Sequence, residues 1–175
     1  MTLQLGNEAP PFSLPGVDGS VHSLDEYGNA PALAVIWSCN HCPYVQAWEG
    51  RMSEIQRDYE SRGARLVAIN SNDAARYPED SFEEMKARAS GEGFAFDYLH
   101  DEDQAVARAY GPSRTPEVFL FDASRRLFYH GAIDDSRDER AVGTTYLRDA
   151  LDALLEDREP PAAQTEPVGC SIKWR

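Results

Sequence analysis

The stretch from Pro31 to Pro43 constrains the fold more than any other part of the chain. Residues 31–37, PALAVIW, form a near-continuous apolar run, typical of a strand buried on both faces of an α/β sheet. The run ends at a polar turn in which two residues separate Cys39 from Cys42. Pro43, tolerated in a first helical turn, opens an apolar pattern in steps of three and four that predicts a helix ending at Gly63. The sequence thus predicts a thiol pair at a strand-to-helix turn.

The remaining patterns predict an α/β fold with a central mixed β-sheet flanked by helices. Strand and helix patterns alternate through the middle of the chain, and a late pair of strands adds an antiparallel hairpin. Asp18-Gly19 is a strong turn signal and predicts an N-terminal β-hairpin extension. Gly91 and Gly93 are expected to stop the second helix. The other expected strands are 12–15, 20–24, 65–70, 94–100, 117–121 and 127–131, and the other expected helices are 81–90, 104–110 and 145–155.

The chain divides at about residue 157. At 175 residues, it is most simply one domain, which we assign to residues 1–157. Residues 158–167 are rich in Pro, Ala and Glu, and we interpret them as a linker. Beyond them, apolar residues alternate with small or polar ones from 168 to 174, so that 158–175 is expected to be a linker followed by a docked, extended tail.

The charge balance excludes some partners. The chain has 17 Lys and Arg against 30 Asp and Glu, a net charge of -13, which disfavours nucleic acid and anionic membrane surfaces. The longest apolar run is too short to span a bilayer. Residues 1–6 show neither a basic region nor a long apolar core, so no signal peptide is visible and we expect a cytoplasmic protein. In a reducing compartment, a close cysteine pair favours catalysis or metal binding over a structural disulfide.

A dithiol at the start of a helix suits redox chemistry. Unpaired N–H groups and partial positive charge at a helix N-terminus favour the thiolate and lower a cysteine pKa from about 8.5 to between roughly 3.5 and 7.5. Half of a zinc site is the main alternative, but His22, His100 and His130 form no spaced pair with the two cysteines. Inert buried thiols are a further alternative. We therefore expect redox-active Cys39 and Cys42, with no metal and no cofactor.

Several motifs resemble a known superfamily. Residues 37–42, WSCNHC, together with Thr115-Pro116 before the 117–121 strand, resemble the thioredoxin superfamily, which implies a thioredoxin-like fold with Pro116 in cis facing the dithiol. Residues 9–14, APPFSL, resemble the redoxin branch, the AhpC/TSA proteins. More narrowly, residues 39–45, 70–73 and 169–174 (CNHCPYV, NSND and GCSIKW) resemble a peroxiredoxin-like subgroup of that branch.

Two reactions compete within this resemblance. In thiol–disulfide exchange, Cys39 attacks a substrate disulfide and Cys42 resolves the mixed disulfide. In a thiol-dependent peroxidase, Cys42 is oxidised by peroxide and Cys39 or Cys170 resolves it. Peroxiredoxins carry an arginine where this chain has Pro116, with Arg114 two residues earlier, so we favour disulfide exchange. The expected partners are a thioredoxin-like or low-molecular-weight thiol reductant and a disulfide or peroxide substrate. A non-catalytic thioredoxin-fold binding module is the third hypothesis.

Five other side chains are candidates near the dithiol. Trp37 is expected to pack against and shield it, and Asn70 either lines the site or ends its strand. His41 either adds positive charge when protonated or is solvated. Glu49 is either a buried proton carrier or a solvated carboxylate, of which we favour the second. Cys170 is either a small apolar residue of the tail or a resolving thiol that the tail delivers.

Overall fold

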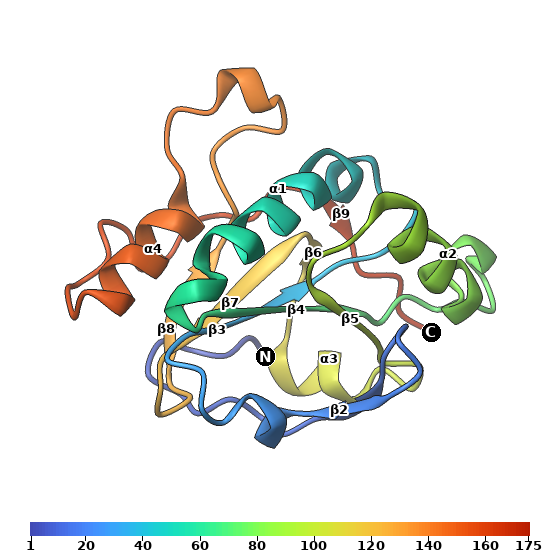
Figure 1. Ribbon diagram of the computed structural model, residues 1–175. Coiled ribbons are helices and arrows are strands. Elements are labelled where there is room, and N and C mark those ends of the chain that lie inside the picture. The colour runs from blue at the N-terminus through green and yellow to red at the C-terminus, as the bar shows by residue number, and fades with distance from the viewer.

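The computed structural model describes all 175 residues and centres on a five-stranded sheet in the order β5-β4-β3-β7-β8 (Figure 1). Its strands are β3 (Leu33–Trp37), β4 (Arg65–Asn70), β5 (Asp97–His100), β7 (Glu117–Phe121) and β8 (Leu127–Gly131). The helices are α1 (Pro43–Tyr59), α2 (Phe82–Glu92), α3 (Ala105–Tyr110) and α4 (Tyr146–Leu155). Short strands outside the sheet are β1 (Ser13–Pro15), β2 (Val21–Ser23), β6 (Arg114–Thr115) and β9 (Cys170–Ser171). The predicted α/β fold with a mixed sheet is confirmed.

The topology brings three connecting segments together at one end of the sheet, where β3 and β4 end and β7 begins. Strands β3, β4 and β5 are parallel, whereas β7 is antiparallel to β3 and β8 is antiparallel to β7. Trp37, the last residue of β3, pairs with Ile69 near the end of β4 and with Glu117 at the start of β7. The turn that carries the thiol pair therefore lies beside the loop that follows β4 and the segment that precedes β7.

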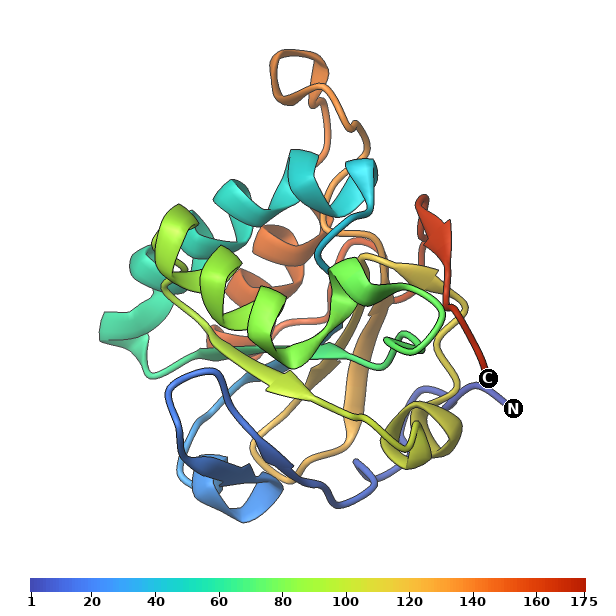
Figure 2. The same ribbon diagram turned by 90° about the vertical axis from the view of Figure 1, so that its right-hand side faces the viewer.

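Both faces of the sheet are covered. Alternate side chains of β3 point to opposite faces, and all five of its residues are buried. On one face, strand residues and residues of α1, α2 and α4 form a cluster of 20 buried side chains. On the other face, strand residues pack with α3, the N-terminal segment and Ile172 of the tail in a cluster of 16. Figure 2 shows this layering. The strand buried on both faces that the apolar run predicts is confirmed.

Several element boundaries differ from the prediction, among them those of α2 and β5. Helix α2 continues through Gly91 and ends at Gly93, whose φ of 62° is left-handed. The expected strand 94–100 is shorter, and β5 begins at Asp97. The reason is that the N–H groups before β5 are used elsewhere: Phe94 donates to the carbonyl of Ala89, and Ala95 donates to Oγ of Ser53.

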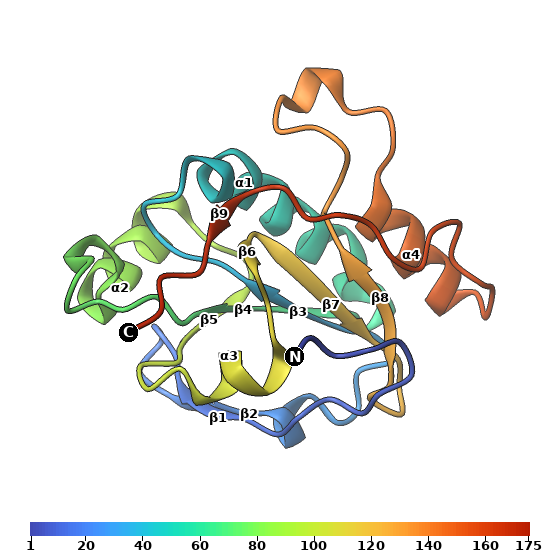
Figure 3. The ribbon, with the colours of Figure 1, turned by 180° about the vertical axis from the view of Figure 1, so that it is seen from behind.

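The N-terminal hairpin and the C-terminal tail complete the fold. Strands β1 and β2 pair antiparallel around the predicted turn. After α4 the tail runs back across the molecule, past β8 and then beside β6 (Figure 3). The N–H of Thr165 donates to the carbonyl of His130 in β8, and β9 pairs antiparallel with β6. None of the helices is long and apolar enough to cross a lipid bilayer.

Candidate active site

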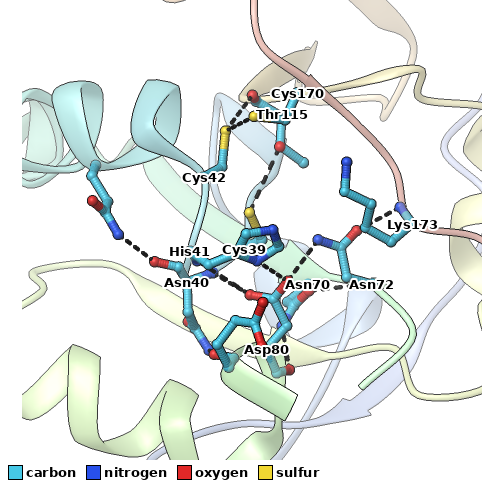
Figure 4. A network of polar contacts seen from close by, with 12 residues as sticks. Cys39, Asn40, His41, Cys42, Asn70, Asn72, Asp80, Thr115, Cys170 and Lys173 are labelled. Atoms are coloured by element: carbon cyan, nitrogen blue, oxygen red, sulfur yellow. Dashed lines mark hydrogen bonds and ion pairs between the residues drawn. The ribbon is translucent and has the colours of Figure 1, made fainter. Parts of the chain in front are cut away.

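The two thiols of the turn lie at the start of α1 (Figure 4). Cys42 is the N-cap residue of α1, with Pro43 at the first helical position. Cys39 is 2% exposed and Cys42 is 0% exposed. Together with Val45 they form a small apolar cluster of their own, separate from the two faces of the sheet. Both cysteines are therefore shielded from solvent.

The segment before β7 forms one wall of the site. The peptide bond between Thr115 and Pro116 is cis, as the resemblance implies. The Cys39 sulfur lies 3.7 Å from Oγ1 of Thr115, and the Cys42 sulfur lies 3.6 Å from the Thr115 carbonyl oxygen. Thr115 is itself fully buried. One residue thus contacts both thiols.

The C-terminal tail packs over the two thiols. In the pairing of β6 with β9, Cys170 is directly opposite Thr115. Its sulfur lies 2.6 Å from that of Cys42, and all three cysteines are free thiols. Unlike the other two, Cys170 is partly exposed. Three thiols, contributed by segments far apart in the sequence, therefore meet at one point.

The surroundings shift the pKa of Cys42 downward and those of Cys39 and Cys170 upward. The pKa of Cys42 is lowered to about 4, chiefly by a hydrogen bond from the Cys39 thiol, with further hydrogen bonds from Cys170 and from the N–H of Val45 outweighing the effect of burial. The same hydrogen bond, burial and the negative charge of Asp80 raise the pKa of Cys39. Burial, followed by the hydrogen bond to Cys42, raises the pKa of Cys170 to about 11.

These pKa shifts favour the opposite order of attack to the one predicted. Cys39 was expected to be the attacking thiolate. Because α1 begins at Pro43, the free N–H groups of its first turn are next to Cys42 and not next to Cys39. The expected effect of a helix N-terminus is present, but it acts on the second cysteine of the pair.

Asp80, in the short 3-10 helix Pro78–Asp80, is a site residue that the sequence patterns did not reveal. Its carboxylate is 0% exposed. Oδ1 accepts hydrogen bonds from the backbone N–H groups of Asn40 (2.7 Å) and His41 (3.3 Å), and Oδ2 accepts one from the amide of Asn72 (2.8 Å). The carboxylate thereby fixes the backbone of Asn40 and His41, the two residues between the cysteines. A three-residue 3-10 helix is too short to show a periodic pattern that could have identified this aspartate.

Three atoms at this loop form the set that comes nearest to a metal site in the active-site region. The Cys39 sulfur, a ring nitrogen of His41 and a carboxylate oxygen of Asp80 lie within 4.8 Å of one another. Both oxygens of Asp80 already accept N–H groups, and a structural zinc ion takes four ligands. The donor set does not fit zinc, and we assign no metal to it.

The other candidates take different places. Trp37 is fully buried, and its Nε1 donates to Oγ of Ser71 at 3.0 Å, consistent with a packing role. The amide of Asn70 donates to the Asp80 carbonyl oxygen at 2.9 Å, beneath the loop. Nδ1 of His41 lies 2.5 Å from Oδ2 of Asp80, so its ring is held in place and not simply solvated. Arg114 is exposed, and its guanidinium forms no hydrogen bond or ion pair.

The expectation for Glu49 is wrong. Its carboxylate is not solvated: the residue is 5% exposed, and the carboxylate forms an ion pair with Arg88 of α2, with one hydrogen bond of 3.0 Å from Nε. Burial raises its pKa, while the hydrogen bond from Arg88 opposes the rise. Because no hydrogen bond joins it to a thiol, Glu49 serves the contact between α1 and α2.

The chain is similar to thiol redox proteins. A family model described as the AhpC/TSA family matches residues 5–130. A curated relative, the thiol-disulfide oxidoreductase ResA of Geobacillus thermodenitrificans, is 26% identical over 125 residues, which are 70% of this chain and 66% of the relative. The chain thus spans slightly less than two thirds of that relative's length. These matches support the prediction of an oxidoreductase.

Two solved structures extend the comparison. An uncharacterised conserved protein from Geobacillus kaustophilus is 44% identical, with a TM-score of 0.93 over 98% of this chain and 93% of that one. A thioredoxin family protein from Chlorobium tepidum TLS, described as a thiol:disulfide interchange protein, is 21% identical, with a TM-score of 0.68 over 87% of this chain and 99% of that one. The second similarity shows the fold alone, and it confirms the thioredoxin-like architecture.

Proposed function

The chain belongs to the AhpC/TSA family, and on that premise we propose that it is a thiol–disulfide oxidoreductase that uses the dithiol of Cys39 and Cys42. The observation that carries this proposal is that Cys39 and Cys42 lie in one turn at the start of α1, with both sulfurs against Thr115. The lowered pKa of Cys42 and the raised pKa of Cys39 suit an attacking and a resolving group, respectively. The ResA relative, named as a thiol-disulfide oxidoreductase, supports the same reaction.

The proposed reaction reduces a substrate disulfide in two exchanges. The Cys42 thiolate attacks one substrate sulfur, the substrate S–S bond breaks, and the leaving thiolate takes up a proton. Cys39 then loses its proton and attacks the Cys42 sulfur of the mixed disulfide. The second substrate thiol leaves, and the enzyme retains a disulfide between Cys39 and Cys42. Two electrons pass from the enzyme to the substrate.

Two neighbours would assist these exchanges. Thr115 contacts the Cys39 sulfur through its hydroxyl and the Cys42 sulfur through its carbonyl, and so helps to fix the positions of the two sulfurs relative to each other. Asp80 holds the backbone of the turn and, through its charge, keeps the proton on Cys39 until the mixed disulfide has formed. A positioned pair of this kind gains rate chiefly from proximity.

We propose a cytoplasmic location and, as reductant, a thioredoxin-like protein or a low-molecular-weight thiol. A reducing compartment would keep the three thiols free between turnovers. Fractionation followed by immunodetection tests the location, and recovery of the reductase activity with each class of thiol tests the reductant.

Peroxide reduction is the second candidate, because the thiolate of Cys42 is the group that a peroxide would oxidise. Peroxide would convert it to a sulfenic acid with release of water, and Cys39 or Cys170 would condense with that acid, releasing a second water. The missing cation disfavours this reaction: Arg114 is exposed and does not contact the thiols. A peroxide lying against Cys42 would have no charged donor to polarise it.

Single-turnover kinetics of the reduced protein test the choice. We expect oxidised glutathione to oxidise the dithiol faster than hydrogen peroxide does, and Cys42→Ser to abolish both reactions. A larger rate constant for peroxide would favour the peroxidase. No loss of thiols with either oxidant would support a non-catalytic binding module instead.

A further inference from the structure

The reactive thiolate is not accessible from outside while the tail is docked. Cys42 is 0% exposed and Cys39 is 2% exposed, whereas Cys170 is partly exposed. Cys170 is therefore the one cysteine of the three that is partly exposed to a thiol in solvent. The exchange of thiols with an external partner depends on access to the attacked sulfur as well as on its chemistry.

The position of Cys170 is built into the fold. Gly169, just before it, lies so close to β6 that a Cβ atom there would be 1.9 Å from the carbonyl oxygen of Thr115. Only glycine permits this approach, and the approach seats β9 on β6 with Cys170 opposite Thr115. The resulting separation of 2.6 Å between the sulfurs of Cys42 and Cys170 is thus a consequence of strand pairing.

The tail is also anchored on both sides of Cys170. On one side, Oγ1 of Thr165 accepts a hydrogen bond from the N–H of Ala132 at 2.9 Å. On the other, the N–H of Lys173 donates to the side chain of Asn72 at 2.9 Å, and Ile172 is buried in the core. Between these anchors only the two-residue strand β9 holds the segment, so it can shift locally while the tail as a whole stays bound.

We propose that Cys170 is a third catalytic thiol, which takes over the disulfide from the buried pair by bonding to Cys42 and presents it to the external reductant. This inference rests on the proposed dithiol exchange and names the route by which the enzyme is reduced. The tail then takes part in the reaction through Cys170, in addition to shielding the other two thiols.

The first step of this route is internal. In the oxidised enzyme, Cys170 loses its proton and attacks the Cys42 sulfur of the disulfide between Cys39 and Cys42. That bond breaks, Cys39 leaves and takes up a proton, and a disulfide between Cys42 and Cys170 results. No electrons enter or leave, and the disulfide has moved to the exposed thiol.

The second step admits the reductant. An external thiolate attacks the sulfur of Cys170, a residue that is partly exposed, and Cys42 leaves as the thiolate that its surroundings stabilise, since a thiol of lower pKa leaves faster. A second reductant thiol then frees Cys170 and forms the oxidised reductant. Two reductant thiols thereby yield one reductant disulfide and the reduced enzyme.

The test compares the wild type with Cys170→Ser and with a matched control, Cys170→Ser/Ser171→Cys, which keeps three thiols. Successive residues of a strand point to opposite faces, so that the relocated thiol faces away from Cys42. Each protein is oxidised with oxidised glutathione, quenched in acid and alkylated, and its disulfides are mapped by mass spectrometry. Reduction of each oxidised protein by glutathione is then followed in a stopped-flow instrument.

We expect the oxidised wild type to contain both a Cys39–Cys42 and a Cys42–Cys170 disulfide. Both variants are expected to be reduced at least about tenfold more slowly than the wild type, because the remaining disulfide is buried. Their own reaction with oxidised glutathione is expected to stay within about threefold of the wild type, since in all three proteins this substrate reaches Cys42 only when β9 shifts locally, a shift that reduction through Cys170 does not need.

The proposal is overturned if the Cys42–Cys170 disulfide is absent from the oxidised wild type, or if Cys170→Ser is reduced at the wild-type rate while its Cys39–Cys42 disulfide forms normally. A wild type that forms no disulfide at all with oxidised glutathione contradicts the dithiol exchange itself, and the three-thiol route with it.

Discussion

The sulfur of Cys42 at the N-cap of α1 lies 2.6 Å from the sulfur of Cys170, a residue 128 positions later in the chain. The first belongs to the turn after β3, and the second to a tail strand that pairs with the segment before β7. This contact links the chemistry of the thiol pair to the docking of the tail.

The first prediction concerns the pH dependence of the Cys42 thiolate. Because its pKa is lowered to about 4, we expect the reduced wild type to show the ultraviolet absorbance of one thiolate at neutral pH and to lose it near pH 4. Cys42→Ser is expected to lack this signal. A signal that appears only above about pH 8, where ordinary thiols ionise, would contradict the assignment.

The same shift predicts how stability changes with pH. A group whose pKa is lower in the folded than in the unfolded state stabilises the fold above its unfolded pKa, about 8.5 for a thiol, and loses this contribution as the pH falls to about 4. The stability difference between the wild type and Cys42→Ser should therefore grow in favour of the wild type from pH 4 to pH 8. Denaturant unfolding across this range measures it. The raised pKa values of Cys39 and Cys170 act in the opposite sense, but only above about pH 8.5.

The substitution Asp80→Asn tests the support beneath the turn. It removes a charge that raises the pKa of Cys39 and weakens the hydrogen bonds from Asn40 and His41. We expect a loss of about 1–3 kcal/mol in the free energy of unfolding, as for a damaged buried hydrogen-bond acceptor. The pH profile of the resolving step should also move to lower pH. The exposed neighbour provides the control, since Glu79→Gln should change neither quantity.

The substitution Gly169→Ala tests the seating of the tail. A methyl group there meets the Thr115 carbonyl, so β9 should separate from β6 and uncover the buried thiols. We expect alkylation of Cys42 by iodoacetamide to become faster by about tenfold, equivalent to about 1.4 kcal/mol less protection. Gly91→Ala is the matched control, because its Cβ meets no atom within 4 Å. Equal alkylation rates in the two variants would show that the tail does not cover the site.

The single variant Cys39→Ser tests whether Cys170 can resolve a mixed disulfide. With Cys39 absent, the nearest remaining thiol to Cys42 is that of Cys170. One turnover with oxidised glutathione should therefore end in a Cys42–Cys170 disulfide, identified by peptide mapping. Accumulation of glutathione on Cys42 in this variant would mean that Cys170 does not reach the bonded sulfur.

The sequence was sufficient for the features that local patterns encode. The apolar run up to Trp37, the helical pattern after Pro43 and the segment Thr115-Pro116 lie where the patterns and the resemblance predict them. Each depends on periodicity or on a short motif. The contact between Cys42 and Cys170 depends instead on the register of β6 with β9, which no local pattern specifies.

The thiol order, Glu49 and Asp80 show where local patterns are insufficient. The order of the thiols depends on which residue caps α1, and helix boundaries are the least certain part of a sequence-based prediction. Glu49 is buried because Arg88 of another helix neutralises it, so its environment is a tertiary property. For the same reason Asp80, whose partners come from the thiol turn and from the loop after β4, could be recognised only in the folded structure.

The central claim is that the Cys42 thiolate attacks the substrate, and the most direct measurement is to trap the mixed disulfide in proteins that retain one thiol. Cys39→Ser/Cys170→Ser keeps only Cys42, and Cys42→Ser/Cys170→Ser keeps only Cys39. Each is mixed with oxidised glutathione, and the adduct is followed by intact-mass spectrometry at neutral pH. The account predicts that the variant with Cys42 forms the glutathione adduct faster than the variant with Cys39, in which the thiol stays protonated. Faster adduct formation on Cys39 would contradict it.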